Sequence, residues 1–103
     1  MNKERKRELE AKGFEVTTVA DFLGLSKHEE AIIELRLALS QELKKRRIGA
    51  RISQERFAKR LETSQARVAK MEAGDKSVSL DLLIRNLLKI GVSRKELAEI
   101  VSS

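Results

Sequence analysis

The chain has 103 residues, with no cysteine, no proline and only three aromatic residues, and its formal net charge is +6. The lack of cysteine excludes disulfides and thiolate metal sites, and no apolar run approaches the roughly 18 residues of a membrane span. The length suits one compact domain, and its wealth of Leu, Ile, Ala and Val favours an all-α fold.

The first third of the chain predicts a tail followed by a short helical extension. Residues 1–12 mix five basic with three acidic residues and almost nothing apolar, so we expect a flexible tail. Residues 13–35 form the expected N-terminal extension, with a short helix at residues 18–23 and then the start of a long helix. Because the N-terminus lacks an apolar signal core, we expect a cytoplasmic protein.

The long helix is expected at residues 27–47. Ser26 and Glu29 stand at capping-box spacing where it begins. Its apolar residues recur at three- and four-residue intervals: Ile32, Leu35, Leu39 and Leu43, with Ile33 and Leu37 beside them. This spacing predicts one apolar stripe along the helix.

Two short helices are expected next, at residues 54–61 and 65–72. Ser53 can cap the first and Ser64 the second, and Gly74 ends the pair. Small and apolar residues fall where such helices pack on each other: Ala58, Leu61, Val68 and Met71. The pattern predicts a helix-turn-helix whose second helix enters the major groove of DNA.

Two further helices complete the chain. Ser79 precedes the helix at residues 80–90, which Gly91 ends, and Ser93 with Glu96 forms a capping box before the last helix. With no strand candidate and no long linker, residues 36–103 form the expected helix-turn-helix DNA-binding domain.

The positive charge is concentrated on one part of the chain. Residues 44–76 hold eleven Lys and Arg against four Asp and Glu, whereas the remaining residues hold eleven against twelve. A basic surface on one region attracts polyanions and speeds their encounter. Since this region coincides with the helix-turn-helix, the charge favours double-stranded DNA as the partner.

The second short helix carries the candidate base contacts, Gln65, Ala66, Arg67 and Lys70. The Gln65 amide can bond to adenine N6 and N7, and Ala66 can meet a thymine methyl group. Lys70 can reach a guanine or a phosphate, and Arg67 suits either a base or a phosphate.

The candidate phosphate contacts surround that helix. Gln54 begins the first helix of the pair, where its backbone N–H and side-chain amide can bind one phosphate with help from the helix dipole. Further candidates are basic or polar residues of the same region: Arg51, Ser53, Arg56 and Lys76.

Residues 36–91 resemble the lambda-repressor-like domain of the Cro and xenobiotic-response-element family of transcriptional regulators. The positions that match its spacing without a gap are Gln54, Ala58, Ser64, Gln65, Val68, Met71, Glu72 and Gly74. The resemblance implies a compact five-helix DNA-binding domain, acting as a homodimer on a partly palindromic operator, most often as a repressor. It also implies an ion pair between Arg47 and Glu72 beneath the recognition helix.

Three residues depart from the family's pattern. Glu62 stands in the turn where glycine is usual, which predicts a strained left-handed residue that costs roughly 1–2 kcal/mol. Arg51 stands where glycine is frequent, and Val78 replaces a common proline. None of the three is a candidate base contact.

The N-terminal thirty-five residues resemble extensions of small regulators that occur beside toxin genes. This resemblance implies an alternative function, an antitoxin that neutralises a partner toxin and regulates its own operon. The segment can form a dimer interface, bind a partner protein, or pack on its own domain, and the sequence leaves these readings open.

Enzymatic activity is not expected. The chain has no cysteine, no tyrosine, one histidine and no glycine-rich phosphate loop. His28 has no partners at metal-ligand spacing, so we expect a surface residue and no cofactor or metal. Three phenylalanines offer little for stacking the bases of single-stranded RNA.

Overall fold

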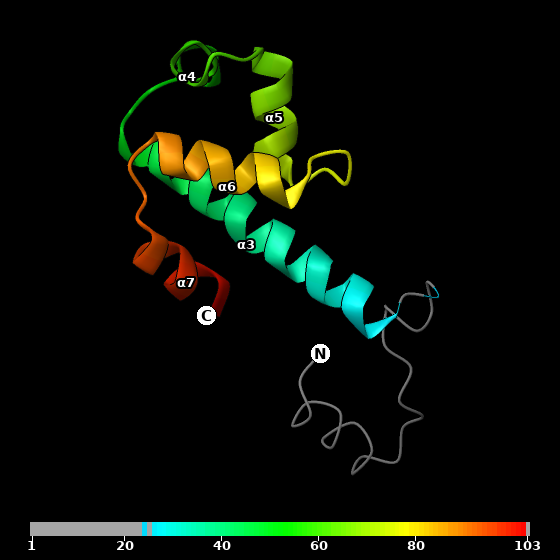
Figure 1. Ribbon diagram of the computed structural model, residues 1–103. Coiled ribbons are helices and arrows are strands. Elements are labelled where there is room, and N and C mark those ends of the chain that lie inside the picture. Colours follow the sequence, from blue (N-terminus) through cyan, green and yellow to red (C-terminus); the bar gives the residue numbers. More distant parts are fainter. Residues whose placement is uncertain (1–23, 25, 103) are drawn as a thin grey trace, which may run out of the picture. The chain divides into compact units, whose positions relative to one another are not determined.

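The computed structural model describes Gly24 and residues 26–102, and the chain divides into two compact units, residues 1–31 and 32–103. The described part holds five helices and no strand (Figure 1): α3 Lys27–Gly49, α4 Gln54–Leu61, α5 Gln65–Ala73, α6 Leu80–Lys89 and α7 Arg94–Ser102. The expected all-α fold is confirmed. The tail at residues 1–12 and the short helix expected at residues 18–23 lie outside the described residues.

Serine hydroxyls fix the starts of α4, α5 and α6. Ser53, Ser64 and Ser79 each accept a hydrogen bond at 3.1 Å from the backbone N–H three residues further on. These bonds satisfy N–H groups that the first turn of a helix otherwise leaves without a partner. The three predicted starts are therefore confirmed, whereas α3 continues to Gly49, two residues beyond its predicted end.

Left-handed residues follow α4, α5 and α6. Gly74 (φ +69°) follows α5, Gly91 (φ +99°) follows α6, and Glu62 (φ +60°) follows α4. Directly after Glu62, the Thr63 N–H donates to the Ala58 carbonyl at 2.9 Å and closes the last turn of α4. The strained turn predicted at Glu62 is therefore present. A residue that carries a side chain is strained at this positive φ, whereas glycine is not.

One apolar core holds α3 to α6 together. Its side chains are all 3% exposed or less: Leu39, Leu43, Phe57, Ala58, Leu61, Val68, Met71, Val78, Leu83, Leu87 and Val92. Full burial of a large apolar side chain contributes roughly 1.5–3 kcal/mol, so this cluster supplies most of the drive to fold.

The apolar stripe on α3 divides into a buried and an exposed half. Leu39 and Leu43 are 1% and 0% exposed, whereas Ile32 is 40%, Ile33 is 37% and Leu37 is 42% exposed. The core reaches α3 from Leu39 onward. The three-and-four spacing predicted one stripe and did not distinguish these halves.

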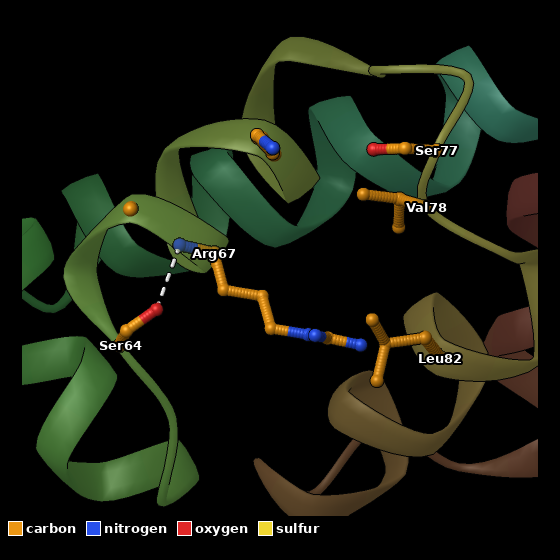
Figure 2. Close-up of a pocket in the computed structure, with 7 residues that line it drawn as sticks. Ser64, Arg67, Ser77, Val78 and Leu82 are labelled. Carbon is orange, nitrogen blue, oxygen red and sulfur yellow. Dashed lines mark hydrogen bonds between the residues drawn. The ribbon is translucent and has the colours of Figure 1, made fainter.

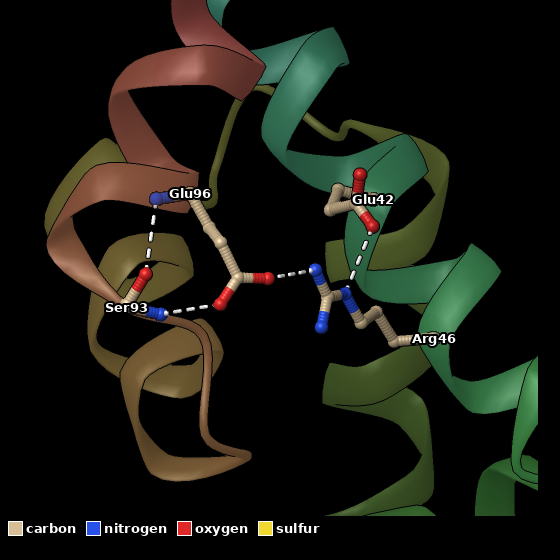
Figure 3. Close-up of polar contacts among 4 residues, drawn as sticks. All are labelled: Glu42, Arg46, Ser93 and Glu96. Atoms are coloured by element: carbon tan, nitrogen blue, oxygen red, sulfur yellow. Dashed lines mark hydrogen bonds and ion pairs between the residues drawn. The ribbon is translucent and has the colours of Figure 1, made fainter.

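The last helix, α7, has no buried residue. On α3, Arg46 Nη2 donates to Glu96 Oε2 at 2.8 Å and Arg46 Nε donates to Glu42 Oε2 at 3.0 Å (Figure 3). The predicted capping box is complete, since the Ser93 N–H donates to Glu96 Oε1 at 3.2 Å and the Glu96 N–H donates to Ser93 Oγ at 3.1 Å. Glu96 therefore both caps α7 and ties it to α3.

Candidate nucleic-acid interface

Small and apolar side chains hold the helix pair α4 and α5 together. Ala58 and Leu61 on α4, and Val68 and Met71 on α5, are each 3% exposed or less. Because protein interiors are close-packed, a larger residue at Ala58 would push the neighbouring side chains apart. These four residues lie where the sequence placed them, and they set the position of α5.

Beneath α5, Arg47 and Glu72 form a bidentate ion pair. Arg47 Nε donates to Glu72 Oε2 at 2.7 Å and Arg47 Nη2 donates to Glu72 Oε1 at 3.1 Å, and the two side chains are 14% and 3% exposed. Arg47 Nη1 also donates to the Ile52 carbonyl at 2.9 Å. The hydrogen bonds with Glu72 raise the pKa of Arg47. The pairing that the family resemblance implied is present.

Gln54 turns its side chain toward this ion pair. Gln54 Nε2 donates to Glu72 Oε1 at 3.1 Å, since a charged carboxylate is a stronger acceptor than a neutral group. One N–H of the side-chain amide that we expected to bind a phosphate is thus engaged within the protein, and the amide has a second N–H. The phosphate contact of Gln54, through this amide and the backbone N–H at the start of α4, stays a prediction.

The outer side of α5 carries the four predicted base contacts. Gln65, Ala66, Arg67 and Lys70 are all exposed. Among the described residues, the Arg67 guanidinium and the Lys70 ammonium have neither a hydrogen-bond nor an ion-pair partner. Their charges are therefore available to an outside partner, and contact with bases stays a prediction.

A groove of about 370 Å³ borders this face of α5. Its lining comes from α5, the loop at residues 75–79 and α6: Ser64, Ala66, Arg67, Lys70, Ser77, Val78 and Leu82. Figure 2 shows the Arg67 side chain extended across the groove toward Leu82. Ser77 and Leu82 were not among the predicted site residues, because nothing in their local sequence links them to α5.

The remaining predicted phosphate contacts are exposed at three places. Arg51 follows α3 and has φ +59°, at the position where glycine is frequent in the family. Ser53 and Arg56 lie at the first turn of α4, where they line a second, open depression of about 480 Å³ together with Glu55 and Lys59. Lys76 lies in the loop after α5. Their contacts with phosphates stay predictions.

The loop that borders the groove is fixed by contacts that the sequence did not predict. Arg36 Nε on α3 donates to the Val78 carbonyl at 3.1 Å, and the Ser77 N–H donates to Asp75 Oδ1 at 2.8 Å. Val78, which replaces the family's common proline, is 3% exposed. In the sequence, the one sign that this loop is anchored was Val78, a lone apolar residue in a polar loop.

The described residues offer no other obvious site. None of their helices is long and apolar enough to cross a membrane, and no group of three or more His, Cys, Asp or Glu side chains among them could hold a metal ion. His28 is exposed on the first turn of α3.

Comparison with known proteins assigns the fold and the helix pair to one family. No curated protein and no solved structure matches the chain. The model of the helix-turn-helix family HTH_3 matches residues 43–97. That range is more than half of the chain and contains α4, α5 and α6 entire. The chain therefore belongs to this helix-turn-helix family of lambda-repressor-like, DNA-binding transcriptional regulators.

Proposed function

We propose that the protein is a sequence-specific repressor that binds double-stranded DNA with α5 in the major groove. One observation carries this proposal: α5 is held from beneath by the Arg47–Glu72 pair, while within the described residues Arg67 and Lys70 on its outer face have no hydrogen-bond or ion-pair partner for their charged groups. A recognition helix needs both properties, because a fixed helix loses little entropy when it binds.

In this proposal Gln65 and Ala66 read bases and Lys70 contacts a base or a phosphate. A glutamine amide placed in the major groove discriminates adenine by about 1–3 kcal/mol. The backbone N–H of Gln54, together with Arg51, Ser53, Arg56 and Lys76, contacts phosphates, which position the protein without reading sequence.

The experiment is selection of bound duplexes from a random DNA pool, first with the natural protein and then with Gln65→Ala. The natural protein should select one sequence, and Gln65→Ala should relax the preference at one base pair of it. If Gln65→Ala selected the same sequence with the same stringency, the role of Gln65 would be refuted. If the natural protein selected nothing, the proposed function itself would fail.

We further propose that the protein acts as a homodimer on a partly palindromic operator. Two half-sites about 34 Å apart, centre to centre, would match a two-fold dimer whose α5 helices lie one DNA turn apart. Sedimentation of the protein on the selected duplex measures the stoichiometry directly, and one protein on one asymmetric half-site would contradict the dimer.

An antitoxin is the second candidate, favoured by the exposed apolar side chains of α3. Ile32 and Ile33 are 40% and 37% exposed, and exposed apolar surface is a common mark of a protein-binding site. The Ile32→Glu, Ile33→Glu double variant should lose co-purification with the product of the neighbouring gene while it keeps its DNA affinity. Unchanged co-purification of the double variant would contradict binding through this surface. If the natural protein formed no complex with that gene product, the antitoxin role itself would be contradicted.

A further inference from the structure

The first half of α3 precedes the segment that the family model matches. That segment is residues 43–97, whereas α3 begins at Lys27, so about four turns of the helix come before it. Part of this stretch exposes Ile32 and Ile33. A later part, residues 36–40, lies against the chain that joins α5 to α6 and contacts it at two points.

The first contact is the hydrogen bond from Arg36 to the loop at residues 75–79. Arg36 Nε donates to the Val78 carbonyl at 3.1 Å, and the bond is partly buried. Inside the loop, the Asp75 carboxylate accepts from the Ser77 N–H and the Asp75 carbonyl accepts from the Val78 N–H. These internal bonds set the shape of the loop, whereas a bond from another helix sets its place. A buried carbonyl without a donor is costly, so the loop stays within reach of Arg36.

The second contact lies at the end of α5. A Cβ at Gly74 would be 2.9 Å from Leu37 Cδ2 and 3.7 Å from Ser40 Oγ. Ser40 is 1% exposed, and its hydroxyl has no hydrogen-bond partner among the described residues, so it serves this contact through its small size. Residues 36–40 of α3 therefore touch the chain where α5 ends and again four residues later, at Val78.

The loop that α3 holds is part of the candidate DNA interface. Lys76, a predicted phosphate contact, lies in it. Val78 lines the groove beside Ala66 and Lys70 of α5 (Figure 2). A loop that moved freely would have to be ordered when the protein binds, and a protein whose binding-competent form is only partly populated binds more weakly in proportion. A loop fixed in advance avoids this loss.

We propose that Arg36 is a positioning residue for DNA recognition. Its bond to the Val78 carbonyl holds the loop, and with it the end of α5, in the arrangement that fits the specific duplex. Arg36 itself contacts no DNA. The proposal rests on the proposed function, since it requires a preferred DNA sequence. It gives the part of α3 before the matched segment a role in DNA binding that is separate from any protein partner.

Two variants of the full chain separate the hydrogen bond of Arg36 from its charge. Arg36→Met and Arg36→Gln both remove the positive charge. Glutamine Nε2 is as many bonds from Cα as arginine Nε, so glutamine can still donate to the Val78 carbonyl, whereas methionine cannot. The readout is the ratio of the affinity for the duplex that the natural protein selects to the affinity for a scrambled duplex. A loss of folded protein lowers both affinities equally and leaves this ratio unchanged.

Arg36→Met should lower the ratio about three- to tenfold, as expected for the loss of one hydrogen bond. Non-specific binding should change less, because it depends mainly on charge and tolerates a displaced loop. Arg36→Gln should keep the ratio of the natural protein. Both variants should keep its slope of log K against log salt, since Arg36 contacts no phosphate. The Val78 N–H should exchange with solvent faster in Arg36→Met than in Arg36→Gln.

Arg85→Met is the matched control, because it removes an arginine charge from an exposed ion pair with Asp81 on α6. Its ratio should equal that of the natural protein.

An unchanged ratio in Arg36→Met would overturn the proposal. So would equal losses in Arg36→Met and Arg36→Gln, or a slope lowered by about 0.9 in both, since the charge of Arg36 would then act on DNA directly. If Arg36→Met did not fold at all, the bond would serve the whole fold and the proposal would again be wrong. If the natural protein selected no duplex, the proposed function itself would fail.

Discussion

Helices α5 and α7 are attached to α3 by neighbouring arginines, yet in very different surroundings. Arg47 pairs with Glu72 of α5, and the two side chains are 14% and 3% exposed. Arg46 pairs with Glu96 of α7, and these side chains are 37% and 43% exposed. The two carboxylates lie at similar hydrogen-bond distances, 2.7 and 2.8 Å from the guanidinium nitrogens. Burial therefore separates the two pairs more than geometry does.

The difference matches what each helix has to do. α5 buries Val68, Met71 and Glu72, so any tilt of the helix disturbs the core. α7 buries no residue, and only Leu97 and Ile100 pack on the edge of the core. We expect α5 to open only with global unfolding and α7 to open at a lower free energy. A recognition helix benefits from opening only when the whole protein unfolds.

Removal of Arg47 should have the largest effect. Arg47→Met leaves the Glu72 carboxylate buried with Gln54 as its remaining partner, so unfolding should become easier by about 3–5 kcal/mol. The midpoint of urea unfolding, followed by circular dichroism, measures this loss. Arg46→Met is the matched control, and its loss should be much smaller because exposed ion pairs contribute little.

A double variant separates the charge from the packing. Arg47→Met, Glu72→Met removes both partners, so no uncompensated charge remains, and much of the lost stability should return. If the double variant were as unstable as Arg47→Met alone, the loss would come from packing around Arg47. Equal losses for Arg46→Met and Arg47→Met would remove the contrast between the two helices.

The end of α5 should respond less strongly. Gly74 has φ +69°, and a Cβ there would lie 2.9 Å from Leu37 Cδ2 on α3. Leu37 is 42% exposed and can move, so Gly74→Ala should cost mainly the left-handed backbone, about 1–2 kcal/mol. Glu62→Gly is the reverse change at the end of α4 and should raise the melting temperature. A stabilising Gly74→Ala would show that this end of α5 rearranges freely.

The local features of the fold were predictable from the sequence. The starts of α4, α5 and α6 follow from serine side chains that bond within the next turn, which depends on a few adjacent residues. The strain at Glu62 followed from the family's preference for glycine at that position. The Arg47–Glu72 pair, 25 residues apart, came from the resemblance and not from the spacing alone.

The direction of individual polar side chains was not predictable. Gln54 bonds to Glu72, 18 residues away, and Arg36 bonds to the Val78 carbonyl, 42 residues away. Both contacts depend on how helices cross, which one-dimensional periodicity does not encode. For the same reason the sequence placed Arg67 on α5 without showing that its side chain crosses to α6.

The pH dependence of the α7 attachment should give the smallest effect. The bond from Arg46, assisted by Ser93, holds the pKa of Glu96 below its usual value of 4.5. A carboxylate with a lowered pKa in the folded state stabilises above the pKa of the unfolded chain and loses this contribution as pH falls through the folded pKa.

Glu96→Gln isolates this contribution, because glutamine keeps the capping box with Ser93 but loses the charge that pairs with Arg46. The natural protein should melt at a slightly higher temperature than the variant at pH 7, and the difference should disappear as the pH falls through the lowered pKa of Glu96. The pKa of Asp75 is lowered too, chiefly by its bonds with Ser77, but Asp75 titrates alike in both proteins and cancels in the difference. A difference that persisted unchanged at low pH would mean that it does not come from the charge of Glu96, and that Arg46, unlike its neighbour Arg47, contributes nothing to attaching a helix.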